Sequence, residues 1–117
     1  MNRHRLLLVD DDELSSSVMQ IILDEEGYDT HLAYDGAEAR EKIRKTEFDL
    51  IILDQKLPDT QGTVLACEIK AVNPEMKLFL LTGFGSDLDG GLEAFEKILT
   101  KPVSPQEMVR LIREALS

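Results

Sequence analysis

The chain has few of the features that tie a protein to a membrane or to an oxidising compartment. It contains one cysteine, Cys67, so it cannot form an internal disulfide, which fits a reducing compartment. No apolar run approaches the length of about 20 residues that crosses a bilayer. The basic start at residues 1–5 leads directly into a strand-like run without a small-residue cleavage site, so we expect no signal peptide. These absences predict a cytoplasmic protein with no membrane contact.

Positive charge is also scarce. The 117 residues include 13 Lys and Arg against 23 Asp and Glu, for a net charge of −10. Such a chain repels the phosphate backbone, which argues against direct binding to nucleic acid. The length supports one hydrophobic core but not two. Because no linker, internal repeat or low-complexity segment interrupts the chain, we expect residues 1–117 to form one domain.

Short apolar runs bounded by turn residues alternate with helical patterns. Runs of this kind predict strands buried on both faces of a parallel sheet. Four clear runs lie at 6–9, 50–53, 78–81 and 98–100, and a weaker one, expected at an edge of the sheet, lies at 29–33. Helices are expected at 13–26, 36–45, 63–71, 92–97 and 105–116, the fourth being the weakest. Five strands and five helices in alternation predict a doubly wound α/β fold with right-handed crossovers.

Several helix starts carry recognisable caps. Asp35 with Glu38, and Ser104 with Glu107, have the spacing of capping boxes. The first helix carries apolar residues on one stripe: Leu14, Val18, Ile21 and Ile22.

Polar residues suited to phosphoryl chemistry follow the four clear runs. They are Asp10, Asp11, Asp12, Asp54, Thr82 and Lys101. In an open α/β sheet the carboxyl ends of the strands share one edge, where ligands bind. We therefore expect a metal and phosphate site at this edge.

The acidic residues suit two roles. Adjacent aspartates repel one another, and a bound Mg²⁺ would relieve the repulsion; alternatively, one caps the following helix and the others face water. Asp54 ends a separate run, and a carboxylate there can attack phosphorus to form an aspartyl phosphate. Thr82 and Lys101 are placed to contact the phosphoryl oxygens.

Four motifs in this order resemble the receiver domain of two-component response regulators. They are LLVDDDE at 7–13, LDQKLPDTQG at 53–62, LLTG at 80–83 and LTKP at 99–102. The resemblance implies a flavodoxin-like three-layer sandwich with strand order 2-1-3-4-5. It also implies a phosphoryl group received from a sensor histidine kinase or a phosphotransfer protein. Phosphorylation and dephosphorylation would be self-catalysed, so the domain is not expected to be an enzyme in the usual sense.

The resemblance assigns roles to individual residues. Asp54 is the phosphoacceptor, Thr82 the switch hydroxyl and Lys101 the partner of the phosphoryl group. Mg²⁺ or Mn²⁺ would be held by Asp10, Asp11, Asp54 and the backbone carbonyl of Lys56. The Lys101–Pro102 bond is expected to be cis. Asp12 matches no required position, and we assign it to the helix start.

The expected signal is a two-state shift transmitted to an output domain or a downstream protein. Its usual surface is formed by the helix at 92–97, the strand at 98–100 and the last helix. We expect this domain to act as a stand-alone receiver or as part of a larger regulator, and as a monomer or a phosphorylation-dependent dimer.

Some positions depart from the family pattern. Ile98 stands where many receivers carry Tyr or Phe as a switch residue. The lifetime positions are Lys56 and Phe84, and we expect the bulky Phe84 to slow attack by water, which the dephosphorylation rate of Phe84→Ala would check. The segment between Thr82 and Lys101 is compressed, so we expect a short, displaced or mobile fourth helix and a weakened switch.

Two other functions compete with this one. Haloacid-dehalogenase-like phosphatases also place an aspartate after their first strand, and Asp10 and Asp12 have the required spacing. However, no acidic pair ends a strand after Lys101, and Asp54 would have no role in such an enzyme. A pseudo-receiver would keep the fold as an interaction module without phosphorylation, but every acceptor-site position is present.

Overall fold

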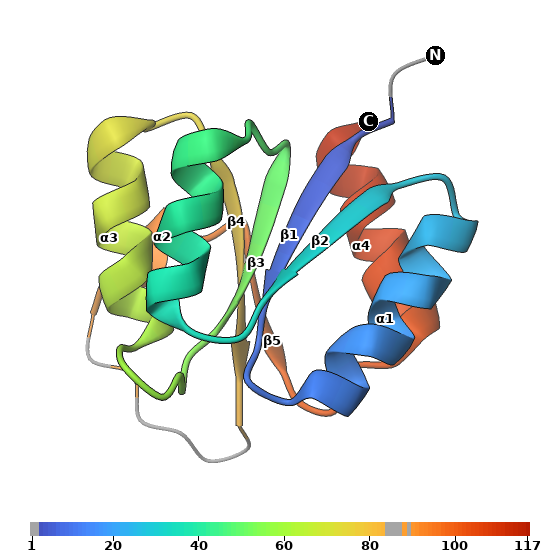
Figure 1. Cartoon of the computed structure of the whole chain (residues 1–117), viewed down its shortest axis with the longest axis horizontal. Helices are drawn as coiled ribbons and strands as arrows, with labels where there is room; N and C mark the ends of the chain where they lie inside the picture. The colour runs from blue at the N-terminus through green and yellow to red at the C-terminus, as the bar shows by residue number, and fades with distance from the viewer. Residues whose placement is uncertain (1–2, 84–87, 89) are drawn as a thin grey trace.

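The computed structural model describes residues 3–83, 88 and 90–117. Five parallel strands form one sheet in the order β2-β1-β3-β4-β5 (Figure 1), as the resemblance implied. They are β1 (Arg5–Val9), β2 (Asp29–Ala33), β3 (Leu50–Asp54), β4 (Lys77–Thr82) and β5 (Lys97–Thr100). The prediction that 29–33 lies at an edge is confirmed.

Helices cover both faces of the sheet. Figure 1 shows α1 (Glu13–Glu25) and α4 (Pro105–Leu116) on one face, and α2 (Gly36–Lys45) and α3 (Gly62–Val72) on the other. Successive residues of a strand point to opposite faces, so each central strand feeds two cores. Leu6 and Leu8 pack toward α1 and α4, whereas Leu7 and Val9 pack toward α2 and α3. This double burial explains why the central strands are continuously apolar.

The helix expected at 92–97 is not formed. A single 3₁₀ turn, η1 (Leu92–Ala94), follows Gly91, and Lys97 already belongs to β5. Gly90 and Gly91 have φ angles of 78° and 73°, a left-handed conformation that a right-handed helix does not contain. The described part of the chain therefore has four α-helices rather than five. Residues 84–87 and 89 of the compressed segment lie outside the described residues.

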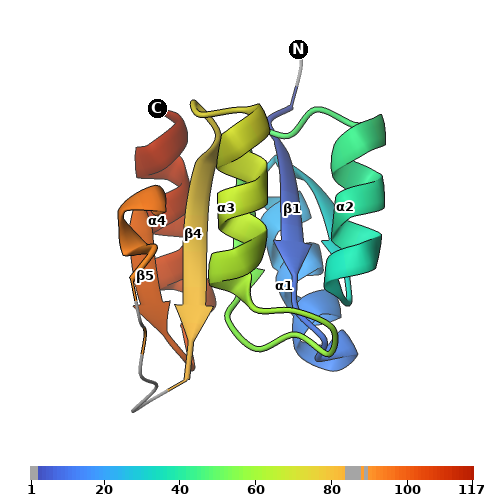
Figure 2. The same cartoon turned by 90° about the vertical axis from the view of Figure 1, so that its left-hand side faces the viewer.

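The prediction that the fourth run is buried on both faces is wrong. Three of the four residues of β5 are exposed, and Ile98 is 41% accessible. The strand pairs with β4 alone, at the edge of the sheet (Figure 2), and this edge position reduces its burial.

The expected N-cap hydrogen bonds are formed, although Glu38 accepts from the N–H of Tyr34 rather than from that of Asp35, and the first helix presents its apolar stripe to solvent. Asp12, Asp35 and Ser104 each accept a hydrogen bond from the backbone N–H three residues on. Three residues of the apolar stripe on α1 face solvent: Leu14, Val18 and Ile21 are 76%, 48% and 59% exposed. The helix instead buries its opposite side, which includes Ser16, Met19 and Leu23. None of the helices in the described ranges combines the length and apolar character needed to span a membrane.

Candidate functional site

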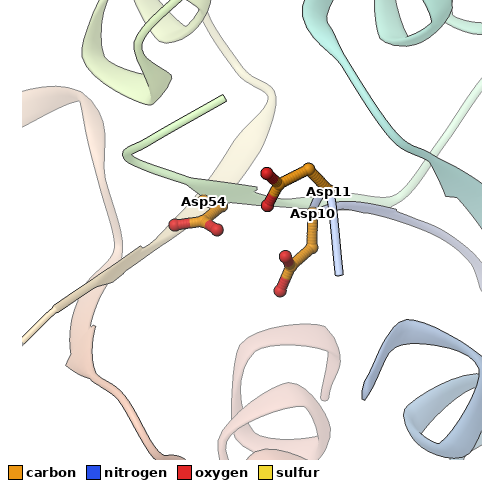
Figure 3. Close-up of side chains that lie close together, drawn as sticks. All are labelled: Asp10, Asp11 and Asp54. Atoms are coloured by element: carbon orange, nitrogen blue, oxygen red, sulfur yellow. The ribbon is translucent and has the colours of Figure 1, made fainter. Parts of the chain in front are cut away.

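Three carboxylates converge where β1 and β3 end. The two strands are neighbours with Val9 opposite Leu53, so Asp10 and Asp54 leave the sheet side by side. Asp10, Asp11 and Asp54 each offer an oxygen within 4.8 Å of the others (Figure 3). Asp10 and Asp54 are only 5% and 6% exposed, whereas Asp11 faces solvent. The predicted cluster is therefore formed by the register of the sheet.

Lys101 joins the cluster from the end of β5. Its Nζ lies 2.7 Å from Asp54 Oδ2 and 3.3 Å from Asp10 Oδ2. Its backbone N–H donates to the carbonyl of Thr82 over 2.8 Å, which holds the lysine beside the end of β4. The Lys101–Pro102 peptide bond is cis, as predicted.

The local charges shift the ionisation of the buried groups. Burial raises the pKa of the Asp54 carboxyl above its ordinary value of 3.8; the hydrogen bond from Lys101 opposes this shift and the charge of Asp10 adds to it. Burial lowers the pKa of Lys101, but its contacts with Asp54 and Asp10 outweigh that effect and the net shift is upward. Lys101 thus stays an ammonium at neutral pH. Three carboxylates with one ammonium leave an excess of negative charge and an all-oxygen donor set, which fits a hard divalent cation.

The other predicted site residues that the structure describes belong to β4, to β5 and to the loop after β3. Thr82 follows the residue paired with Asp54, and its buried hydroxyl donates to the carbonyl of Gly83 over 3.4 Å. The backbone N–H of Lys56 lies 3.4 Å from Asp54 Oδ1. Ile98 pairs with Leu80 two residues before the end of β4. Phe84 lies outside the described residues.

Asp12 serves the start of α1, as expected. Its carboxylate accepts from both the N–H and the hydroxyl of Ser15. The bond from the Ser15 N–H lowers the pKa of Asp12. The N–H of Asp12 in turn donates to Asp10 Oδ1 over 3.0 Å, which orients that carboxylate.

Two polar residues of the loop after β3 have contacts that the sequence analysis missed. Gln55 Oε1 accepts from the N–H of Thr63 at 3.0 Å, at the start of α3. Asp59 accepts from the N–H groups of Gly36 and Ala37, at 2.7 and 2.9 Å, at the start of α2. The hydrogen bond from Gly36 is the main reason that the pKa of Asp59 is lowered. Such contacts form only in the folded loop, and no local sequence pattern predicts them.

Comparison with known families decides the relationship. The model of the response regulator receiver domain matches residues 6–113. The chain belongs to this family. The match covers both strand ends that carry the acidic cluster, and it favours the receiver interpretation over the haloacid-dehalogenase alternative.

Relatives of this chain include longer proteins. The transcriptional regulatory protein ZraR of Salmonella typhimurium is 31% identical over 116 residues. The alignment covers 96% of this chain but 26% of ZraR, so the chain spans about a quarter of the length of the curated relatives it matches. The chain is a receiver domain of the two-component response regulator type.

Solved structures agree in fold. A CheY-like receiver from Methanospirillum hungatei superposes with a TM-score of 0.88 at 32% identity, covering 98% of this chain and 94% of that one. The response regulator TrrA of Thermotoga maritima, solved in complex with Mg²⁺-BeF, has a TM-score of 0.86 at 31% identity. That superposition covers 97% of this chain and 99% of TrrA.

Proposed function

We propose that Asp54 accepts a phosphoryl group from a phosphohistidine, with Mg²⁺ or Mn²⁺ held by the adjacent acidic residues. The observation that carries this proposal is the convergence of Asp10, Asp11 and Asp54 with Lys101, at distances of 2.7 and 3.3 Å from the ammonium to the two buried carboxylates. A carboxylate beside an ammonium and a metal-binding pair is equipped to attack phosphorus.

Each residue of the site has its own role in the transfer. Asp54 attacks the phosphorus atom with a carboxylate oxygen, the P–N bond to the donor breaks, and its electron pair stays on the imidazole nitrogen. Lys101, already bonded to Asp54, then faces the phosphoryl oxygens. The bound cation would neutralise the charge that accumulates as the anionic group approaches. The Asp10 and Asp11 carboxylates and the Lys56 carbonyl would hold that cation, and the Thr82 hydroxyl would turn from Gly83 toward the new oxygens.

A phosphodonor also needs a place to dock. The exposed stripe of α1, formed by Leu14, Val18 and Ile21, lies on the helix that begins directly after the acidic cluster. The other side of the same helix, at Ser16 and Met19, lines a cavity of about 230 Å³ that also includes Asp10 and Lys101. We propose that a helix of the histidine kinase or phosphotransfer protein packs on the exposed stripe of α1, which brings its phosphohistidine to the carboxyl ends of β1 and β3. The cytoplasmic location and the oligomeric state expected from the sequence stay predictions.

Incubation with acetyl phosphate and Mg²⁺, followed by intact mass measurement, tests the acceptor role. We expect one phosphoryl adduct on the wild type, none on Asp54→Asn, and none when EDTA replaces Mg²⁺. Asp12→Asn is the matched control, because asparagine also caps a helix and the adduct should persist. A wild type that stays unmodified would instead support the pseudo-receiver. Catalytic turnover of phosphate esters that requires Asp10 would support the phosphatase.

A further inference from the structure

The end of the acceptor strand is fastened to the first turn of α3 through one side chain. Gln55, the residue after Asp54, is partly buried, and its amide makes two contacts with Thr63. Gln55 Oε1 accepts from the Thr63 N–H at 3.0 Å, and Nε2 lies 3.4 Å from Thr63 Oγ1. The carbonyl of Gln55 also accepts from the N–H of Gly62 over 2.9 Å. Side chain and backbone of one residue therefore hold the beginning of α3.

The start of α3 depends on this help. The first N–H groups of any helix lack partners within the helix, and the N-cap side chain usually supplies one. Gln61 occupies the N-cap position, but its side chain makes no such hydrogen bond. Gln55 replaces it from outside the helix. Because a Cβ on Gly62 would lie 2.6 Å from the carbonyl oxygen of Asp54, the helix start also sits directly against the acceptor residue.

The loop between Gln55 and Gly62 contains Lys56, whose backbone carbonyl is the expected metal ligand. Lys56 forms an isolated antiparallel bridge with Gln61, and the N–H of Leu57 donates to the carbonyl of Thr60 over 3.2 Å. Lys56 is therefore held on both sides: Gln55 precedes it in the chain, and its backbone pairs with Gln61 at the start of α3. Any shift of α3 against β3 would move this carbonyl relative to Asp54.

We propose that Gln55 is a positioning residue that sets the Lys56 carbonyl against the carboxylate cluster and thereby sets the affinity for Mg²⁺. This inference rests on the proposed function, since it assumes that the cluster binds the cation. Residues that orient metal ligands typically change metal affinity by 10- to 100-fold when they are replaced. An apolar side chain of the same length would fill the space beside α3 but would leave the Thr63 N–H without its acceptor.

The test compares Mg²⁺ binding and phosphorylation in Gln55→Met and Gln55→Leu. Calorimetric titration should give a dissociation constant for Mg²⁺ that is weakened about 10-fold in both variants. The acetyl phosphate reaction should need more Mg²⁺ for half-maximal rate, while the rate at saturating Mg²⁺ stays near the wild-type value. Gln61→Ala is the matched control, because the Gln61 side chain caps nothing, and its Mg²⁺ affinity should be unchanged.

The outcomes separate this inference from the function it rests on. Wild-type Mg²⁺ affinity in both variants would overturn the positioning role and leave the acceptor role intact. A lower saturating rate with unchanged affinity would overturn it too, since Gln55 would then act on the transfer step. If both variants are unfolded without metal by circular dichroism, Gln55 is a folding residue and the proposal fails. If the wild type binds no Mg²⁺, the proposed function fails and this inference with it.

Discussion

At the scale of single residues, the acceptor site keeps like charges together at the expense of stability. Asp54 is buried against Asp10, and the single ammonium of Lys101 serves both carboxylates. The upward pKa shift of Asp54 means that the metal-free folded state binds its proton more tightly than the unfolded state does. The contribution of Asp54 to the stability of the folded state therefore falls as the pH rises from 3.8 through its raised folded-state pKa.

Removing the acceptor charge should stabilise the metal-free protein. We expect Asp54→Asn to raise the free energy of unfolding by about 1 kcal/mol at pH 7 in EDTA, because one of the repelling carboxylates is gone. The difference from the wild type should shrink as the pH is lowered through the raised pKa of Asp54, because the wild-type carboxyl then takes up its proton. Urea unfolding followed by circular dichroism measures both effects. A less stable variant at pH 7 would show that the ion pair with Lys101 outweighs the repulsion.

At the scale of secondary-structure elements, α1 exposes three large apolar side chains, Leu14, Val18 and Ile21. We expect Leu14→Asp to slow phosphotransfer from a histidine donor at least several-fold, because the charge disrupts apolar docking on the stripe. Phosphorylation by acetyl phosphate, which needs no docking, should keep its wild-type rate. Leu14 is 76% exposed, so the folded state should tolerate the change.

Val72→Asp is the control for this substitution. Val72 is 88% exposed at the end of α3, away from the carboxyl ends of the strands, and its change should leave both reactions unaltered. If Leu14→Asp slowed the reactions with both phosphodonors equally, the substitution would have damaged the acceptor site rather than docking.

A second contact between elements joins the loop after β3 to α2. Asp59 caps α2 through Gly36 and Ala37, and these bonds lower its pKa. A group with a lowered folded-state pKa stabilises the protein above its ordinary pKa, and this stability is lost as the pH falls through the folded-state value. We expect Asp59→Ala to lower the unfolding temperature at pH 7 and to reduce the loss of stability below pH 3.8. Thermal unfolding from pH 7 to pH 2 measures this, and parallel curves for both proteins would contradict it.

The elements that could be predicted from the sequence are those that depend on local patterns. The runs ending at Val9 and Leu53 are apolar throughout because both of their faces are covered, whereas their neighbouring positions were expected from the strand order that the family resemblance implies. Residues 92–97 misled the prediction, since only Leu92–Ala94 form a 3₁₀ turn and Lys97 already begins β5, so no full α-helix lies between Gly91 and that strand. The contacts of Gln55 and Asp59 were missed because their partners lie on helices that only the tertiary fold brings near.

At the scale of the whole molecule, acidic residues are in excess, and a bound cation would reduce the repulsion between them. We therefore expect cation binding to stabilise the folded protein. A ligand that binds only the folded state adds about 2.7 kcal/mol at a concentration 100 times its dissociation constant. We expect Mg²⁺ to raise the unfolding temperature of the wild type progressively, and to have little effect on Asp11→Ala, which lacks one of the three carboxylates. Differential scanning calorimetry at constant ionic strength measures the shift. An equal shift in both proteins would indicate a general salt effect.

The contact between Asp59 and the start of α2 also supplies a spectroscopic reporter. The amide protons of Gly36 and Ala37, on α2, donate to the carboxylate of Asp59, which lies in the loop after β3 three residues beyond Lys56. Their NMR resonances and hydrogen-exchange rates should therefore respond when the loop after β3 rearranges. Two amides on α2 can thus follow events at Asp54 from outside the acceptor site, without any label placed in it.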